Sequence, residues 1–224
     1  MKHKTAHDNL PSVLLTGFDA FGGDTLNPSW LAVQALHDGV VDGHRIVAAQ
    51  LPTAFEDSGP LLLKLLRKHK PVLVICVGLA GGRAALSLER IAINVDDARI
   101  ADNAGAQPVD MPVVKGGPPA YFSSLPIKAM LQTLTAAGIA AEVSQTAGTF
   151  VCNHVFYVLM HALKKQRKLR DGRPVRGGFV HIPYLPGQGE PCMPLQDVVL
   201  GLRLAISCAV TTEHDALLGA GALN

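Results

Sequence analysis

The sequence has little net charge, few aromatic residues and no long apolar run. Its 20 Lys and Arg against 18 Asp and Glu leave a net charge of +2, too small to favour nucleic acid or an anionic membrane as a partner. No apolar run reaches the roughly 18 residues that predict a membrane-spanning helix. The polar start MKHKTAHDNL lacks the apolar stretch of a signal peptide. We expect residues 1–10 to form a flexible tail.

Cysteine is also scarce, and the four cysteines are widely separated, at Cys76, Cys152, Cys192 and Cys208. This spacing fits neither a disulfide framework nor the paired ligands of a structural zinc site. A reducing compartment is the simpler interpretation, so the sequence predicts a cytoplasmic protein.

What the chain does contain is a large hydrophobic fraction, 48% of 224 residues, enough for one full core. Strand-like runs alternate with helix-like segments, and no repeat or domain boundary interrupts them. We therefore predict a single three-layer α/β/α domain over residues 11–224, with a mixed, mostly parallel central sheet. The expected strands are 13–15, 44–51, 72–77, 86–97, 140–145 and 177–184, and the expected helices are 28–36, 55–69, 124–137, 196–210 and one beginning at Cys152.

Two glycine-rich loops follow predicted strands, TGFDAFGG at 16–23 and GLAGGR at 78–83. Such loops often bind ligands in α/β proteins, although the first lacks the pattern of a phosphate loop. Its residues Phe18 and Phe21 either cover the core or wall a flat apolar pocket. Asn27 precedes Pro28 and is a typical N-cap.

Cys152 stands where a small polar segment gives way to an apolar helical pattern. A thiol at a helix N-terminus lies among unpaired N–H groups, which should lower its pKa and favour the nucleophilic thiolate. A small buried core cysteine is the alternative.

A cysteine nucleophile needs a base and a group that orients the base. Most of the nine histidines lie in the tail, at polar element ends or on the wrong side of the helix, which leaves His181 near the end of a strand cut off by Pro183. Glu89 is in phase with apolar residues of the predicted strand 86–97, so it is either the orienting carboxylate or an ion-pair partner of Arg90 or Arg99.

A zinc site built from Cys152, His154 and His161 is disfavoured, because the three do not share a helix face. Residues 107–119 carry four prolines and two glycines, which predicts a long surface loop, either a lid or an assembly element. Residues 164–176 read as a basic, solvated connection.

Several motifs occur in a fixed order between about 13 and 185: TGFDAFGG with Asn-Pro-Ser, GLAGGR, ERIAINVDDARIADN, AYFSSLPIKAM, GTFVCNH and GGFVHIPYLP. In these the sequence resembles the pyroglutamyl peptidase type I (pyrrolidone-carboxylate peptidase) family of cysteine peptidases. The resemblance implies hydrolysis of N-terminal pyroglutamyl residues from peptides, with no metal or cofactor, by a cytosolic homo-oligomer that is commonly a tetramer.

The same resemblance implies roles for seven residues. The catalytic triad falls on Glu89, Cys152 and His181, and the residues associated with the substrate are Phe18, Phe21, Asn27 and Arg99. Ala20, Leu79 and Ala101 depart from residues common in the family. None of these departures removes a group needed for the chemistry.

Two other classes of function remain open on the sequence. A nucleoside phosphorylase-like enzyme would use glycine-rich strand-end loops to hold phosphate. A non-catalytic binder of small cyclic amides would bind its ligand in the same pocket but would catalyse no reaction.

Overall fold

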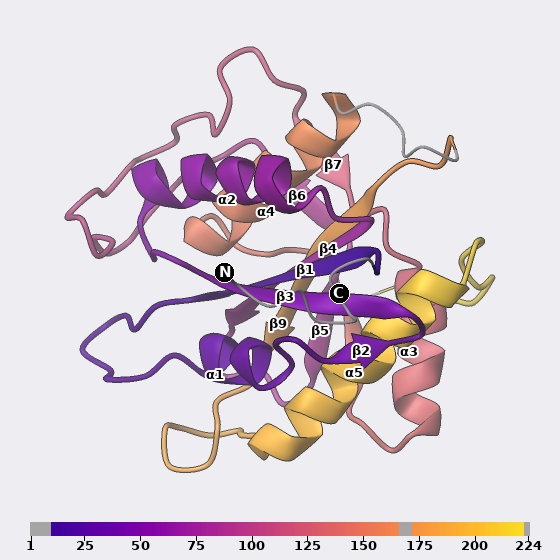
Figure 1. Cartoon of the computed structure of the whole chain (residues 1–224). Helices are drawn as coiled ribbons and strands as arrows, with labels where there is room; N and C mark the ends of the chain where they lie inside the picture. Colours follow the sequence, from indigo (N-terminus) through magenta and orange to yellow (C-terminus); the bar gives the residue numbers. More distant parts are fainter. Residues whose placement is uncertain (1–9, 166–171, 222–224) are drawn as a thin grey trace, which may run out of the picture.

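The computed structural model describes residues 10–165 and 172–221 (Figure 1). A seven-stranded sheet runs through it in the order β2-β3-β1-β4-β9-β5-β8, and a separate two-stranded ribbon pairs β6 with β7. The tail predicted for 1–10 lies almost entirely outside the described residues, as does the middle of the basic connection 164–176.

The strands are β1 (Ser12–Phe18), β2 (Val40–Val41), β3 (His44–Leu51), β4 (Leu73–Leu79), β5 (Leu86–Glu89), β6 (Ile91–Ile93), β7 (Ala120–Phe122), β8 (Ala141–Ser144) and β9 (Arg176–Ile182). The helices are α1 (Pro28–Ala35), α2 (Phe55–His69), α3 (Ile127–Ala136), α4 (Val151–Lys165) and α5 (Leu195–Thr211).

The sheet is mixed and mostly parallel, as predicted. Strands β3, β1, β4 and β9 pair in parallel, and so do β5 and β8, whereas β5 runs antiparallel to β9. The apolar runs of β1 and β4 are almost completely buried, as expected for central strands covered on both faces. Pro183 ends β9 immediately after Ile182, so His181 lies near a strand end, as predicted.

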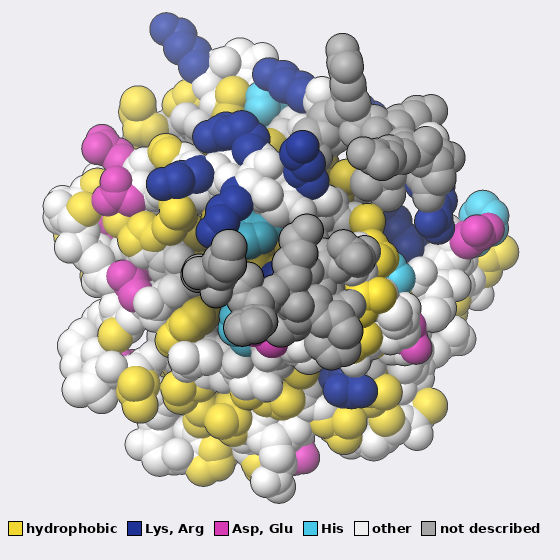
Figure 2. Space-filling view, viewed as in Figure 1, with side chains coloured by type: hydrophobic (Ala, Val, Ile, Leu, Met, Phe, Trp, Pro, Cys, Tyr) yellow, Lys and Arg dark blue, Asp and Glu magenta, His cyan; other side chains and the backbone are white. Residues whose placement is uncertain are grey.

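Helices cover both faces of the sheet, which confirms the three-layer architecture (Figure 1). One core lies under α2 and α4, and the other lies under α1, α3 and α5. Helix α2 has the predicted bounds and amphipathic pattern, with Leu62 and Leu66 buried and Lys64, Arg67 and Lys68 exposed. In Figure 2 Lys and Arg side chains gather on the upper part of the face, where α2 and α4 lie in Figure 1.

Some of the sequence predictions need correction. The strand expected over 86–97 breaks at Arg90, so β5 belongs to the main sheet and β6 to the ribbon. Because of this break, Glu89 does not share a strand face with Ile91 and Ile93. Helix α4 begins at Val151, one residue before Cys152. The short strands β2 and β7 were not predicted, because two or three residues carry too little periodic pattern.

The 107–119 segment has no helix or strand, in agreement with the predicted loop. Among the described residues, none of the helices has the length and apolar character needed to span a membrane.

Candidate active site

The Cys152 thiol lies directly against strand β4. An added Cβ at Gly78 would be 2.9 Å from Cys152 Sγ, so the sulfur rests almost on the strand backbone. Gly78 is the register partner of His181 on the neighbouring strand β9. Side chains of directly paired residues point to the same face of a sheet. The sheet therefore places the imidazole of His181 on the face where Cys152 Sγ lies.

Phe179 gives an independent check of this placement. Its ring would be 2.8 Å from a Cβ at Gly78, and its centroid lies 4.8 Å from that of His181. Phe179 and His181 are two residues apart on β9, so both project to the face covered by α4. The thiol and the imidazole thus share one small space above β4 and β9.

Glu89 reaches His181 from the antiparallel strand β5. Its Oε1 lies 2.7 Å from His181 Nδ1, with Glu89 fully buried and His181 only 4% exposed. Ser87 is the register partner of His181, and Glu89 follows two residues later on the same face. A carboxylate accepts hydrogen bonds only, so the bond fixes the proton on Nδ1 and leaves Nε2 free to act as a base.

Arg83 also contacts this carboxylate, and no sequence argument identified it. Its Nη1 donates to Glu89 Oε1 at 2.8 Å. Arg90 and Arg99 are the ion-pair partners that the sequence suggested for Glu89. Arg90 instead donates to Gln145 Oε1 and to the carbonyl of Ala220. The GLAGGR motif contained Arg83, but only the tertiary structure shows that this loop returns to the end of β5.

The other residues of the VCNH motif hold the first turn of α4. Asn153 is fully buried, accepts from Ile93 N–H, and donates to the carbonyls of Ile93 and Val95. His154 Nδ1 lies 2.8 Å from Asp96 Oδ2. The helix start that carries Cys152 is therefore tied to β6 and to the segment after it.

The acidity of Cys152 differs from the sequence expectation. Burial, and to a smaller extent the Glu89 carboxylate, raise the pKa of its thiol to about 12, although the Arg83 guanidinium acts in the opposite direction. The expectation of a lowered pKa was wrong, because loss of solvent around the sulfur raises it. At neutral pH the resting site therefore holds a thiol, which needs a base to become a nucleophile.

The first glycine-rich loop is held from three sides. Asn27 Oδ1 accepts from Ser29 N–H and Oγ–H, and its Nδ2 donates to the carbonyl of Asp19. Asp19 Oδ1 accepts from Thr53 N–H, and Asn103 Nδ2 donates to the carbonyl of Ala20. Asn27 is the helix cap that the sequence predicted, and its amide is engaged in shaping this loop.

The two phenylalanines of this loop have different surroundings. Phe18 is 2% exposed and packs against Phe179, so it belongs to the core beneath the site. Phe21 is half-buried, and its ring lies 5.3 Å from that of Phe150, which directly precedes α4. Phe150 in turn packs edge-on against Phe55. Phe21 and Phe150 thus form an aromatic wall beside the helix start, and sequence analysis did not identify Phe150.

Arg99 is exposed, in a bend of the segment after Asp97. Within the described part of the chain, no hydrogen bond or ion pair joins it to Cys152, His181 or Glu89. The structure thus brings together three of the seven residues named from the sequence. It places Phe18 in the core and Asn27 in the loop framework, whereas Phe21 is half-buried against Phe150 and Arg99 is exposed.

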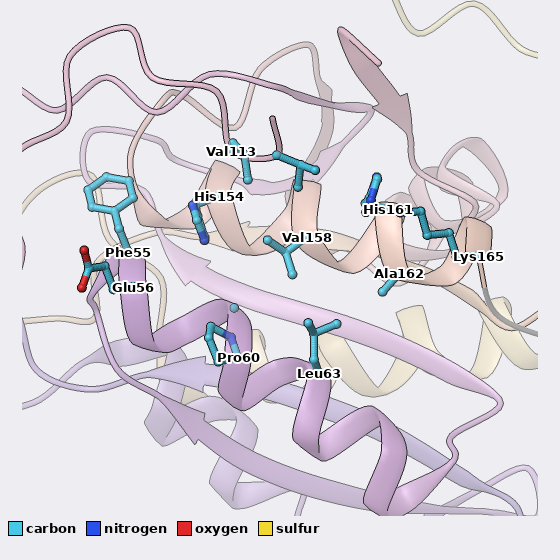
Figure 3. A pocket seen from close by; sticks show the side chains of 12 residues that line it. Phe55, Glu56, Pro60, Leu63, Val113, His154, Val158, His161, Ala162 and Lys165 are labelled. Atoms are coloured by element: carbon cyan, nitrogen blue, oxygen red, sulfur yellow. The ribbon is translucent and has the colours of Figure 1, made fainter. Parts of the chain in front are cut away.

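A separate groove of about 440 Å³ lies between α2 and α4 (Figure 3). Its lining is mostly apolar and includes His154 and His161 but not Cys152. His161 Nδ1 contacts the hydroxyl of Tyr121, so the two histidines of the zinc alternative have separate partners. Across residues 10–165 and 172–221, no group of three or more His, Cys, Asp or Glu side chains could hold a metal ion.

Comparison with known proteins gives consistent matches over the whole described fold. The model of the pyroglutamyl peptidase family matches residues 11–212. Pyrrolidone-carboxylate peptidase 1 of Ralstonia nicotianae is 54% identical over 220 residues, covering 96% of this chain and 100% of that protein. The pyrrolidone-carboxylate peptidase of Bacillus cereus is 50% identical, covering 92% of this chain and 96% of that protein.

Solved structures agree with these sequence matches. The crystal structure of pyroglutamyl peptidase I from Bacillus amyloliquefaciens is 44% identical with a TM-score of 0.88, covering 94% of this chain and 100% of that one. Pyrrolidone carboxyl peptidase from Thermococcus litoralis is 34% identical with a TM-score of 0.84, covering 90% of this chain and 94% of that one.

Proposed function

This chain belongs to the pyroglutamyl peptidase family, and we propose that it removes N-terminal pyroglutamyl residues with Cys152 as the nucleophile. The observation that carries the proposal is the arrangement of the three side chains. Glu89 binds His181 Nδ1 at 2.7 Å, and Cys152 Sγ lies over Gly78, the register partner of His181. The protein is a cysteine peptidase, and it uses this arrangement to cleave an amide bond.

The reaction begins from a thiol and a neutral imidazole. His181 Nε2 takes the proton of Cys152 as the sulfur attacks the carbonyl carbon of the pyroglutamyl residue, which forms a tetrahedral oxyanion. The first N–H groups of α4 have no acceptor within the helix and lie beside the sulfur, so they stabilise this oxyanion. Glu89 holds the imidazole and stabilises its positive form.

The remaining steps return the site to its resting state. His181 gives its proton to the departing amine, and the C–N bond breaks to leave a thioester on Cys152. His181 then draws a proton from a water molecule that attacks the thioester, and free pyroglutamate leaves as the thiol is restored. The base is needed first because a thiol pKa of about 12 leaves little thiolate at neutral pH, and again because the attacking water must lose a proton.

The substrate end group is a flat lactam without a free α-amine. Such a group fits an apolar wall with one hydrogen-bond donor and one acceptor, and it needs no carboxylate to pair with an ammonium group. Phe21 and Phe150 supply the wall, Phe18 supports it from the core, and Asn27 shapes the loop. The backbone of the two glycine-rich loops supplies the polar contacts, and Arg99 approaches the substrate from its exposed segment. A prolyl group lacks the lactam carbonyl and adds a charge, so it leaves buried polar groups unpaired.

We further propose that residues 11–224 form one peptidase domain and that the enzyme is a cytoplasmic homotetramer without a metal or cofactor. All four cysteines are free, which suits a reducing compartment. Ile100, Val109 and Met111 are exposed in or near the 107–119 loop, which suits a surface buried between subunits. Light scattering of the purified protein tests the assembly, and a monomer would contradict it.

The test of the function is release of a fluorescent amine from a pyroglutamyl amide, compared with the matching prolyl amide. We expect cleavage of the first compound only, full loss after iodoacetamide, and no effect of EDTA. Cys152→Ser and His181→Ala should each abolish turnover in a folded protein. Wild-type turnover by folded Cys152→Ser would refute the assignment. Phosphate-dependent turnover that survives alkylation would favour the phosphorylase class, and binding without turnover would favour the small-ligand binder.

A further inference from the structure

Arg83 joins three segments at the active site. It lies on the loop between β4 and β5, and its Nη1 donates to Glu89 Oε1 at 2.8 Å and to Ser144 Oγ at 3.3 Å. Its Nη2 donates to the carbonyl of Thr146 at 3.1 Å. Ser144 ends β8 as the register partner of Glu89, and Thr146 belongs to the turn that leads into α4. One guanidinium therefore contacts both the orienting carboxylate and the turn before the nucleophile.

The Glu89 carboxylate depends on few partners. Its Oε1 accepts hydrogen bonds from both Arg83 and His181, whereas its buried Oε2 has no hydrogen-bond partner within the described residues. Glu89 is fully buried, so its charge is costly unless opposite charge compensates it. Arg83 is the permanent cation in contact with it, with a side chain that is 27% exposed.

The groups that face Glu89 are few and come from several elements. His181 faces it from β9, and Arg83 faces it from the β4–β5 loop. The Cys152 thiol interacts with it electrostatically from α4. Glu142 on β8 lies one step further away and accepts from Ser87 Oγ. Of these, only Arg83 is positive whatever the state of His181.

We propose that Arg83 is a positioning residue of the peptidase reaction, which fixes Glu89 and offsets its charge so that His181 stays neutral until Cys152 gives up its proton. The inference rests on the proposed function. Without Arg83, an uncompensated buried carboxylate would hold His181 as imidazolium or would itself take a proton. Both outcomes mean that the Glu89–His181 pair binds one proton more tightly.

This gives an expected shift with a definite sign. Loss of Arg83 should move the acidic limb of the kcat/KM profile to higher pH, because the base then loses its proton only in more alkaline solution. We expect a shift of about one pH unit for a unit charge at this distance, after allowance for partial solvent exposure. Arg83→Lys keeps the positive charge but loses the planar guanidinium. Its acidic limb should therefore lie close to that of the wild type, while its kcat should recover only in part.

The experiment compares Arg83→Met, Arg83→Gln and Arg83→Lys with Arg90→Met as the matched control. Arg90 follows Glu89 directly, but its guanidinium bonds to Gln145 and Ala220 instead. The first readout is the pH profile of kcat/KM for the pyroglutamyl amide. The second is the pH dependence of Cys152 alkylation by iodoacetamide, located by mass spectrometry. Thermal unfolding checks that each variant is folded. If Arg83→Met does not fold, Arg83→Gln replaces it as the variant without the charge.

The expected result is a higher-pH acidic limb in both profiles for Arg83→Met and Arg83→Gln, a fall in kcat of about ten-fold or more, and a wild-type profile for Arg90→Met. Unchanged profiles in folded Arg83→Met, or the same change in Arg90→Met, would overturn the inference. The alkylation profile needs no substrate. If the wild-type protein cleaved no pyroglutamyl amide, the proposed function would fail, while the role of Arg83 toward the thiol would still be measured.

Discussion

The contact between Gly78 and Cys152 gives the sharpest prediction. In Gly78→Ala the new Cβ would lie 2.9 Å from Cys152 Sγ and 2.8 Å from Phe179 Cζ. Favourable contacts between such atoms begin near 3.5 Å, so the sulfur and the ring must move by roughly 0.5–1 Å. Strand β4 cannot yield easily, because it pairs with β9 along its whole length, Gly78 included, and with β1 up to Cys76. Overpacking of this kind costs about 1–3 kcal/mol of stability.

The effect on catalysis should exceed the effect on stability. A displacement of about 1 Å at the reacting atom reduces rates by about 100-fold. We therefore expect Gly78→Ala to lose about 100-fold in kcat/KM for a pyroglutamyl amide while remaining folded. Steady-state kinetics and urea unfolding, measured on the same preparation, separate the two effects.

Gly177→Ala is the matched control for this substitution. Gly177 lies on β9, and an added Cβ there would meet Leu163 Cδ1 at 2.7 Å, near the other end of α4. It should cost a similar free energy of unfolding but leave kcat/KM per folded molecule close to the wild-type value. Wild-type kcat/KM in folded Gly78→Ala would refute the placement of the thiol against β4, and equal losses in both variants would show a general effect of strain.

Two further predictions concern stability. Asn153→Ala should lower the free energy of unfolding by about 2–4 kcal/mol, because it removes a fully buried side chain and its three hydrogen bonds to the backbone of Ile93 and Val95; a loss below 1 kcal/mol in urea unfolding would contradict this. Burial raises the pKa of the Cys76 thiol from its ordinary value of 9.0 to about 12, so the stability that the neutral thiol contributes is fully present below about pH 9 and is lost as the pH rises towards 12. The wild-type protein should therefore lose stability faster than Cys76→Ala above pH 9, by up to about 1.4 kcal/mol per pH unit, and parallel pH dependences of urea unfolding would exclude this effect.

Local sequence patterns were sufficient for most of the framework. Apolar runs without interruption identified the central strands, and the amphipathic pattern of 55–69 identified α2 with its observed bounds. Asn27 before Pro28 indicated a helix start, which the structure has. These features depend on residues close in the sequence, so the sequence alone carries them.

Pairing between segments that are distant in the sequence could not be predicted from such local patterns. Nothing in residues 86–97 marks the change of sheet at Arg90 or the antiparallel direction of β5, because both depend on which strands are neighbours. The contact of Arg83 with Glu89 and the packing of Phe21 against Phe150 likewise join segments that are far apart in the sequence. Hydrogen-bond geometry and packing between elements decide such contacts, and composition does not express them.

The sequence by itself determined the fold class and the family motifs, and it predicted which residues act as nucleophile, base and carboxylate. Tertiary structure decided how these groups act. It placed Cys152 against Gly78, where desolvation raises the thiol pKa. It also brought Arg83 to Glu89. The physical reason is that residue type sets the chemistry available to a side chain. Its protonation state and its contacts depend on solvent exclusion and on neighbouring charges, and only the folded chain supplies these.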